Sequence, residues 1–155
     1  MKIRYLGHAT FVITSNKGIK IVTDPYAPKP DLLSYGEINE SADIVTVSHE
    51  HFDHNNVAAV GGNPEVVKQA GRSEAKGIEF KGIASYHDDA GGSLRGNNII
   101  FCFVVDGIRL CHLGDLGHLL DDEQLEEVGR LISCSSRWGV NIPLTPKPPP
   151  RSVTS

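Results

Sequence analysis

One short run of metal-ligand side chains constrains this chain more than any other feature. Positions 49–54 read His-Glu-His-Phe-Asp-His, and the three histidines and the aspartate are potential metal ligands. The run follows residues 43–47, an apolar stretch with the composition of a buried strand. We therefore predict a metal site where a strand runs out into a loop. The alternative is a solvated loop that is rich in histidine.

The spacing of these ligands suggests two ions rather than one. His49 and His51 lie two residues apart, so on an extended backbone their side chains point the same way and can hold one ion. Asp53 and His54 come after the bend and are expected to reach a second ion nearby. Imidazole nitrogens combined with a carboxylate suit Zn²⁺, with Mn²⁺ or Fe²⁺ as alternatives.

The pattern H-x-H-x-D-H after a strand resembles the motif of the metallo-β-lactamase superfamily. This resemblance implies an α/β (α+β) protein, an αββα sandwich with a one- or two-metal hydrolase site. It also implies that His87, at the end of a predicted strand, is the third ligand of the first ion. Asp115 would bridge both ions, and Gly114 before it allows a close backbone approach. The alternative for His87 is a structural or solvated histidine.

Two further segments resemble one branch of that superfamily, which includes ascorbate-6-phosphate lactonase-like proteins. They are Tyr-Leu-Gly-His-Ala-Thr at residues 5–10 and Thr-Asp-Pro at residues 23–25. In this branch the corresponding histidine and aspartate lie near the metal pocket. The resemblance therefore implies that His8 and Asp24 orient the metal ligands from outside the coordination sphere. The alternatives are a turn residue for His8 and a strand-end cap for Asp24.

The resemblance also implies a mechanism. A metal-bound hydroxide would attack the carbonyl or phosphoryl centre of a small-molecule ester, lactone, amide or phosphodiester. Asp53 and His54 are the residues expected at the reacting centre, with Asp53 positioning the nucleophile. His112 and His118 are expected to line the pocket, and the alternative for His118 is to replace a missing ligand.

Composition argues against several classes of partner. The chain has 155 residues, enough for one domain, and its formal net charge of -4 argues against a nucleic-acid partner bound through a basic face. No apolar run approaches membrane-spanning length, and no signal peptide precedes the strand-like residues 2–6. Cys102 and Cys111 lie in apolar runs, so we expect buried thiols in a reducing, cytoplasmic compartment.

The remaining pattern predicts short strands and little helix. Strands are predicted at residues 2–6, 10–14, 18–23, 98–105 and 108–113, with a glycine-punctuated strand pattern over 65–84. Short helices are predicted at 55–60 and 121–130, the second with a capping box of Asp121 and Gln124.

Two loops are expected near the site. Residues 27–40 have no clear period and are expected at its mouth. The glycine-rich loop 90–97 lacks the spacing of a nucleotide-binding loop. Arg95, its one cation, either holds an anionic substrate or is solvated.

The resemblance covers a partial domain, residues 1–130, and stops there. Residues 131–155 have no strand or helix period, and residues 143–150 contain five prolines, so we expect an irregular tail. A back-translation of residues 130–140 shifted by two bases gives Val-Asp-Ile-Leu-Leu-Ile-Pro-Val-Gly-Gly, a family-like strand and turn. We therefore expect a frameshifted or truncated chain that lacks the last metal-binding histidine. The alternative function is then a non-catalytic relative of such a hydrolase. Because missing strands would expose core surface, a homo-oligomer is a further expectation.

Overall fold

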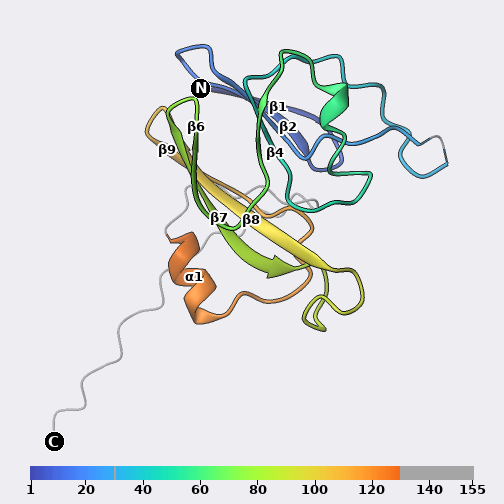
Figure 1. Ribbon diagram of the computed structural model, residues 1–155, viewed down its shortest axis with the longest axis vertical. Helices are drawn as coiled ribbons and strands as arrows, with labels where there is room; N and C mark the ends of the chain where they lie inside the picture. The colour runs from blue at the N-terminus through green and yellow to red at the C-terminus, as the bar shows by residue number, and fades with distance from the viewer. Residues whose placement is uncertain (30, 130–155) are drawn as a thin grey trace, which may run out of the picture.

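Two β-sheets carry the fold of residues 1–29 and 31–129, the part of the chain that the computed structural model describes (Figure 1). One sheet has five strands in the order β1-β2-β3-β4-β5, and the other has four in the order β6-β7-β8-β9. The strands of the first sheet are β1 (Lys2–Gly7), β2 (Thr10–Thr14), β3 (Lys20–Thr23), β4 (Ile44–Thr46) and β5 (Glu65–Val67). Those of the second are β6 (Gly71–Ala75), β7 (Ile78–Tyr86), β8 (Asn97–Val105) and β9 (Ile108–His112).

The first sheet is mixed, and its parallel part positions half of the site. β1, β2 and β3 form an antiparallel meander, whereas β3, β4 and β5 pair in parallel. Thr23 is the register partner of Thr46, so the residues that follow β3 and β4 leave the sheet side by side. Asp24 and the histidine-rich run therefore emerge at the same edge, the place where open parallel sheets collect functional side chains.

The second sheet is antiparallel and positions the other half. β7 and β9 both pair with β8 in antiparallel fashion, so they run in the same direction and end at the same side. His87 follows the end of β7, and Asp115 lies three residues beyond the end of β9. The β8–β9 turn has positive φ at Asp106 (52°) and Gly107 (79°), as the predicted hairpin requires.

Three apolar clusters bury the faces of the two sheets. Between the sheets, Ile21 and Ile44 of the first pack in one cluster with Phe80 and Phe101 of the second. The outer face of the first sheet is covered by the crossover after β3, including the buried Tyr26. The outer face of the second is covered in part by α1 (Asp122–Val128) through Val128, beside β7 in Figure 1. The core is thus a sandwich of two sheets.

The predicted metallo-β-lactamase-like α/β fold is confirmed by these sheets and by the related structures reported below. The capping box is also confirmed, because the Asp121 carboxylate accepts from the backbone N–H of Gln124, whose side chain accepts from the backbone N–H of Asp121. Two boundaries differ. The helix predicted at 55–60 is a single 3₁₀ turn, η1 (Val57–Ala59), and the helix predicted at 121–130 is shorter. The 3₁₀ turn ends because Val60 is extended (φ -97°, ψ 116°), and α1 ends at Gly129, whose φ is 68°.

Two further expectations concern burial and the tail. Cys102 and Cys111 are buried as expected, with their sulfurs 3.5 Å apart across β8 and β9. The predictions for residues 131–155 lie outside the described residues. Among those described, no helix combines the length and the hydropathy needed to span a bilayer.

We predict that the Ile44→Ala substitution destabilises the chain by about 2–5 kcal/mol, because it leaves a cavity between the sheets where the side chain is 0% exposed. Ile3→Ala is the matched control, since Ile3 is 52% exposed and its loss is expected to change stability by less than about 0.5 kcal/mol. Urea unfolding followed by circular dichroism measures both. Equal midpoints for the two variants would contradict the assignment of the core.

Candidate metal centre

Seven potential ligands gather in two adjacent groups beside the ends of the strands. Within each group, the ligand atoms all lie within 4.8 Å of one another. The first group is His49, His51 and His87, and the second is His8, Asp53, His54 and Asp115. The Nε2 atom of His87 lies 2.9 Å from Oδ2 of Asp115, so the groups adjoin. The structure thus brings together all six residues that the sequence predicted as ligands and adds His8.

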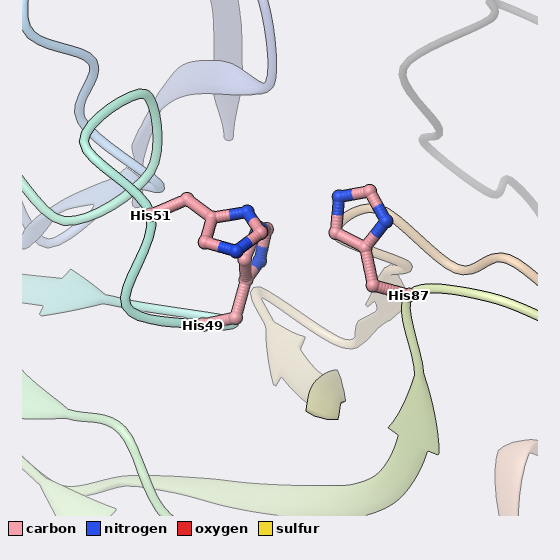
Figure 2. Close-up of side chains that lie close together, drawn as sticks. All are labelled: His49, His51 and His87. Carbon is pink, nitrogen blue, oxygen red and sulfur yellow. The ribbon is translucent and has the colours of Figure 1, made fainter. Parts of the chain in front are cut away.

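The first group opens on solvent at one side. Figure 2 shows His49 and His51 on the loop after β4 and His87 on the chain after β7, with the three rings around a common space. The ring centroids lie 4.5 to 5.2 Å apart. His49 is buried, whereas His51 is exposed and lines a cavity of about 450 Å³ together with His87 and Asp115. A small molecule can therefore approach this group from the cavity.

A fully buried carboxylate, Asp24, organises the histidines from behind. Its Oδ1 accepts from the backbone N–H of Ser48 at 2.7 Å. Its Oδ2 lies 2.6 Å from Oγ of Ser48, 2.9 Å from Nδ1 of His54 and 2.8 Å from Nε2 of His112. Burial by itself would raise the pKa of Asp24, but the imidazoles of His112 and His54 hold it well below its usual range. Asp24 is therefore an ionised acceptor for all of these donors.

This carboxylate sets the tautomer of His49 through Ser48. A carboxylate only accepts, so the single hydroxyl proton of Ser48 is donated to Asp24. The same hydroxyl oxygen is then free to accept from Nδ1–H of His49, 2.9 Å away. Nε2 of His49 therefore carries a lone pair, and this buried atom has no hydrogen-bond partner among the described residues. Burial and the charge of His54 lower the pKa of His49 to about 4, so the ring is neutral. A buried lone pair of this kind suits a metal ion.

Asp24 acts on His54 directly. Nδ1–H of His54 donates to Asp24, which turns Nε2 toward Asp115, 3.4 Å away, and Asp53, 3.8 Å away. Burial opposes a charge on this ring, yet hydrogen bonds with Asp115 and Asp24 raise the pKa of His54 to about 9. The second group therefore favours positive charge at this point, which a proton supplies in the metal-free protein and a cation can supply in its place.

Asp53 is the carboxylate of this group that is partly open to solvent. Its side chain is 18% exposed and lines the same cavity as His51. Burial would raise the pKa of Asp53, but the hydrogen bond with His8 and the nearby His54 lower it to about 2. The Asp53 carboxylate is therefore charged at neutral pH and available to a cation or a water.

Two glycines allow Asp115 to reach the centre. Gly114 has a φ of 58°, and a Cβ there would lie 2.6 Å from Cβ and Oγ of Ser48. A Cβ at Gly117 would overlap the backbone of His87, and the Gly117 N–H donates to the carbonyl of Tyr86. The chain after β9 therefore lies directly against the ends of β4 and β7. The close approach predicted for Gly114 is confirmed.

The structure also locates the remaining predicted residues. His112 is buried against Asp24 and belongs to neither group, and its Nδ1 has no partner among the described residues. His118 accepts the backbone N–H of Tyr86 at 3.1 Å and lies outside both groups, so the alternative in which it replaces a ligand is not supported by its position. Residues 27–40 mostly cross the outer face of the first sheet, although Lys29 stacks on Phe52 at the cavity.

Sequence reasoning missed three residues that hold the site in place. Ser48 links Asp24 to His49, and its position directly before the histidine run was the available signal. Asn98 accepts the Asp115 backbone N–H with its Oδ1 and donates to the carbonyl of Leu113. Asp88 accepts four backbone N–H groups of the glycine-rich loop, including that of Arg95 at 2.7 Å. Only the folded chain reveals the roles of Asn98 and Asp88.

Comparison with known families places this centre in context. Residues 2–131 match the family model described as beta-lactamase superfamily domain, which is most of the chain. The chain therefore belongs to the beta-lactamase superfamily.

Similar proteins within this superfamily are named metal-dependent hydrolases. A UPF0173 metal-dependent hydrolase of Methanospirillum hungatei is 30% identical over 151 residues, covering 83% of this chain and 65% of that protein. Another from Pelotomaculum thermopropionicum is 34% identical over 110 residues, covering 71% and 44%. The chain thus matches less than two thirds of the length of these relatives, and they support a metal cofactor.

Solved structures agree with this placement. A Thermotoga maritima protein of the metallo-beta-lactamase superfamily is 38% identical, with a TM-score of 0.67 over 85% of this chain and 58% of its own. CmlA, a diiron beta-hydroxylase from Streptomyces venezuelae, is 15% identical with a TM-score of 0.59, covering 85% of this chain and 33% of its own. The second likeness shows the fold alone.

We predict that Asp24→Asn weakens metal binding by about 10–100-fold, the usual effect of losing a partner that orients metal-binding imidazoles. The amide nitrogen cannot accept a hydrogen bond from His54, His112 or Ser48, so the tautomers are no longer fixed. Asp43→Asn is the matched control, since the Asp43 carboxylate accepts the Lys20 backbone N–H in the same sheet and lies outside both groups. Zn²⁺ dissociation constants from chelator competition measure the effect. Equal constants for the two variants would show that Asp24 does not organise the centre.

Proposed function

We propose that this chain is part of a metal-dependent hydrolase with a two-metal centre. His49, His51 and His87 would hold the first ion, and Asp53 and His54 the second. Asp115 would bridge the ions, since it is within 2.9 Å of His87 and 3.4 Å of His54. The observation that carries the proposal is the convergence of two ligand groups whose imidazole lone pairs are fixed toward each other by one buried carboxylate.

The chemistry of the donor set favours Zn²⁺, with Mn²⁺ or Fe²⁺ as the other candidates, because it combines imidazoles with carboxylates. When bound, such ions supply Lewis acidity and lower the pKa of a coordinated water toward about 7. Two side chains of the protein would position the water and the second ion. Asp53, ionised and partly exposed at the cavity, would accept a hydrogen bond from the attacking water and orient it. His54, held between Asp24 and Asp115, would keep the second ion beside that carboxylate.

The substrate would be a small molecule bound in the cavity beside His51. An ester, a lactone, an amide and a phosphodiester all fit the proposed chemistry. Arg95 bears on the choice, since it is the only lysine or arginine among the described residues that line the cavity of about 450 Å³ with His51, Asp53 and Asp115. Asp88 fixes the loop that carries Arg95 by accepting four backbone N–H groups. We therefore favour a substrate with an anionic group, bound by the Arg95 guanidinium.

A cytoplasmic location and a homo-oligomer stay predictions from the sequence. The alternative function is a non-catalytic relative that binds metal without turnover. This chain covers only 65% and 44% of the two relatives described above, so the alternative needs a direct test. Measuring both metal content and hydrolysis distinguishes the two functions.

We predict that His51→Ala weakens binding of the first ion at least about 10–100-fold, the effect already expected for an outer-sphere partner, because a ligand is lost outright. Hydrolysis of generic ester and phosphodiester substrates should fall with it. His118→Ala is the matched control, since His118 is a nearby histidine outside both groups. Inductively coupled plasma mass spectrometry gives the metal content. Unchanged metal in His51→Ala would show that the site assignment is wrong, and full metal without turnover in the wild type would favour the non-catalytic relative.

We predict that Arg95→Ala raises KM about tenfold for an anionic ester and leaves KM for its neutral analogue unchanged, because one charge-assisted hydrogen bond is lost. Arg72→Ala is the control, since Arg72 lies on β6 and lines a different cleft. Steady-state kinetics on the substrate pair measure the effect. Equal changes for both substrates would contradict the role assigned to Arg95.

A further inference from the structure

We propose that His8 is a direct ligand of the second ion rather than a residue that orients ligands from outside. This inference rests on the proposed function and adds a fourth protein donor to Asp53, His54 and Asp115. His8 is buried, at 6% exposed, and its Nε2 lies 2.9 Å from Oδ2 of Asp53 and 3.1 Å from Nε2 of His54. Its ligand atom is within 4.8 Å of every other ligand atom of that group.

The hydrogen-bond roles at this point favour a shared cation. Nδ1–H of His54 donates to Asp24, so once a cation displaces the second proton of this ring, Nε2 of His54 presents a lone pair beside His8. The Asp53 carboxylate presents another. A single proton on Nε2 of His8 can be donated either to Oδ2 of Asp53 or to Nε2 of His54. The acceptor that does not receive it still lies within hydrogen-bond distance of the His8 nitrogen but gains no hydrogen bond from it. A metal ion among the three atoms satisfies all of them at once.

The backbone is shaped to deliver this imidazole. His8 has a φ of 53°, a left-handed conformation that few non-glycine residues adopt, and it follows Gly7 with a φ of 139°. The pairing of β1 with β2 shifts register between Tyr5 and Gly7. The Tyr5 hydroxyl donates to the His8 carbonyl at 3.1 Å and braces the turn. The irregular strand end thus turns a side chain inward that regular pairing would leave on the sheet.

Zn²⁺ in proteins is mostly four-coordinate, and in catalytic sites it can expand to five-coordinate, so four protein donors still leave a position for a water. With Asp53, His54 and the shared Asp115 alone, the second ion has three. His8 adds a fourth donor from the turn between β1 and β2, remote in sequence from the other ligands. The second ion would therefore tie β1 to the loop after β4 and to the chain after β9.

Two variants separate a ligand from a positioning residue. His8→Ala removes the imidazole. His8→Gln places an amide N–H near the position of imidazole Nε2, so it can still donate to Asp53 but is a poor ligand for Zn²⁺. The full chain of each variant and of the wild type is titrated with Zn²⁺ against a chromophoric chelator, and zinc-edge X-ray absorption counts the imidazoles per pair of ions. His118→Gln is the control.

We expect two ions in the wild type and, in both His8 variants, a first ion of wild-type affinity with a second ion weakened more than about 100-fold, beyond the effect of an outer partner. The imidazole count at saturation should fall by one per pair of ions. Wild-type affinity for both ions in His8→Gln would assign His8 a positioning role and overturn the inference alone. A wild type that binds no Zn²⁺ would instead overturn the proposed function together with it.

Discussion

The buried carboxylate of Asp24 is the interaction on which the centre depends. It receives two hydrogen bonds from Ser48, one from His54 and one from His112, all without access to solvent. An unpaired charge at this depth would strongly destabilise the fold, so these donors must be in place together. Their alignment turns the lone pairs of His49 and His54 toward the two ligand groups. The same carboxylate therefore stabilises this corner of the fold and prepares the site.

The fold brings the groups together because both sheets end at the same place. β3 and β4 are parallel neighbours, and Asp24 and the histidine run follow them at one edge. β7 and β9 run in the same direction on either side of β8, and His87 and Asp115 follow their ends. The Ser48 carbonyl accepts the Ile99 N–H at 2.9 Å, which joins the edge of the first sheet to β8 of the second. A site assembled from both sheets in this way is sensitive to how they pack, so the central core and the metal ligands are expected to respond to common perturbations.

The sequence predicted most of the fold and six of the seven residues proposed as ligands, because their signals are local or came from a motif. Alternation and turn residues located the strands, and Asp106-Gly107 located the β8–β9 hairpin. What escaped prediction depends on contacts between distant segments. His8 and His54 are 46 residues apart and their Nε2 atoms meet at 3.1 Å only after β1 bends. The helices were predicted too long because the backbone leaves the helical conformation at Val60 and at Gly129, which the apolar pattern does not reveal. Membership of the superfamily does not by itself fix the reaction, since one fold supports several chemistries.

Anomalous diffraction at the zinc edge, from crystals of the chain grown with Zn²⁺, would locate the ions themselves. A two-metal centre gives two peaks, one among His49, His51 and His87 and one beside Asp53 and His54, with Asp115 between them at the roughly 3.5–4 Å separation of two-metal sites. A single peak in the first group would leave the second ion unsupported. The absence of any peak in either group, or peaks only at surface histidines such as His118, would contradict the account.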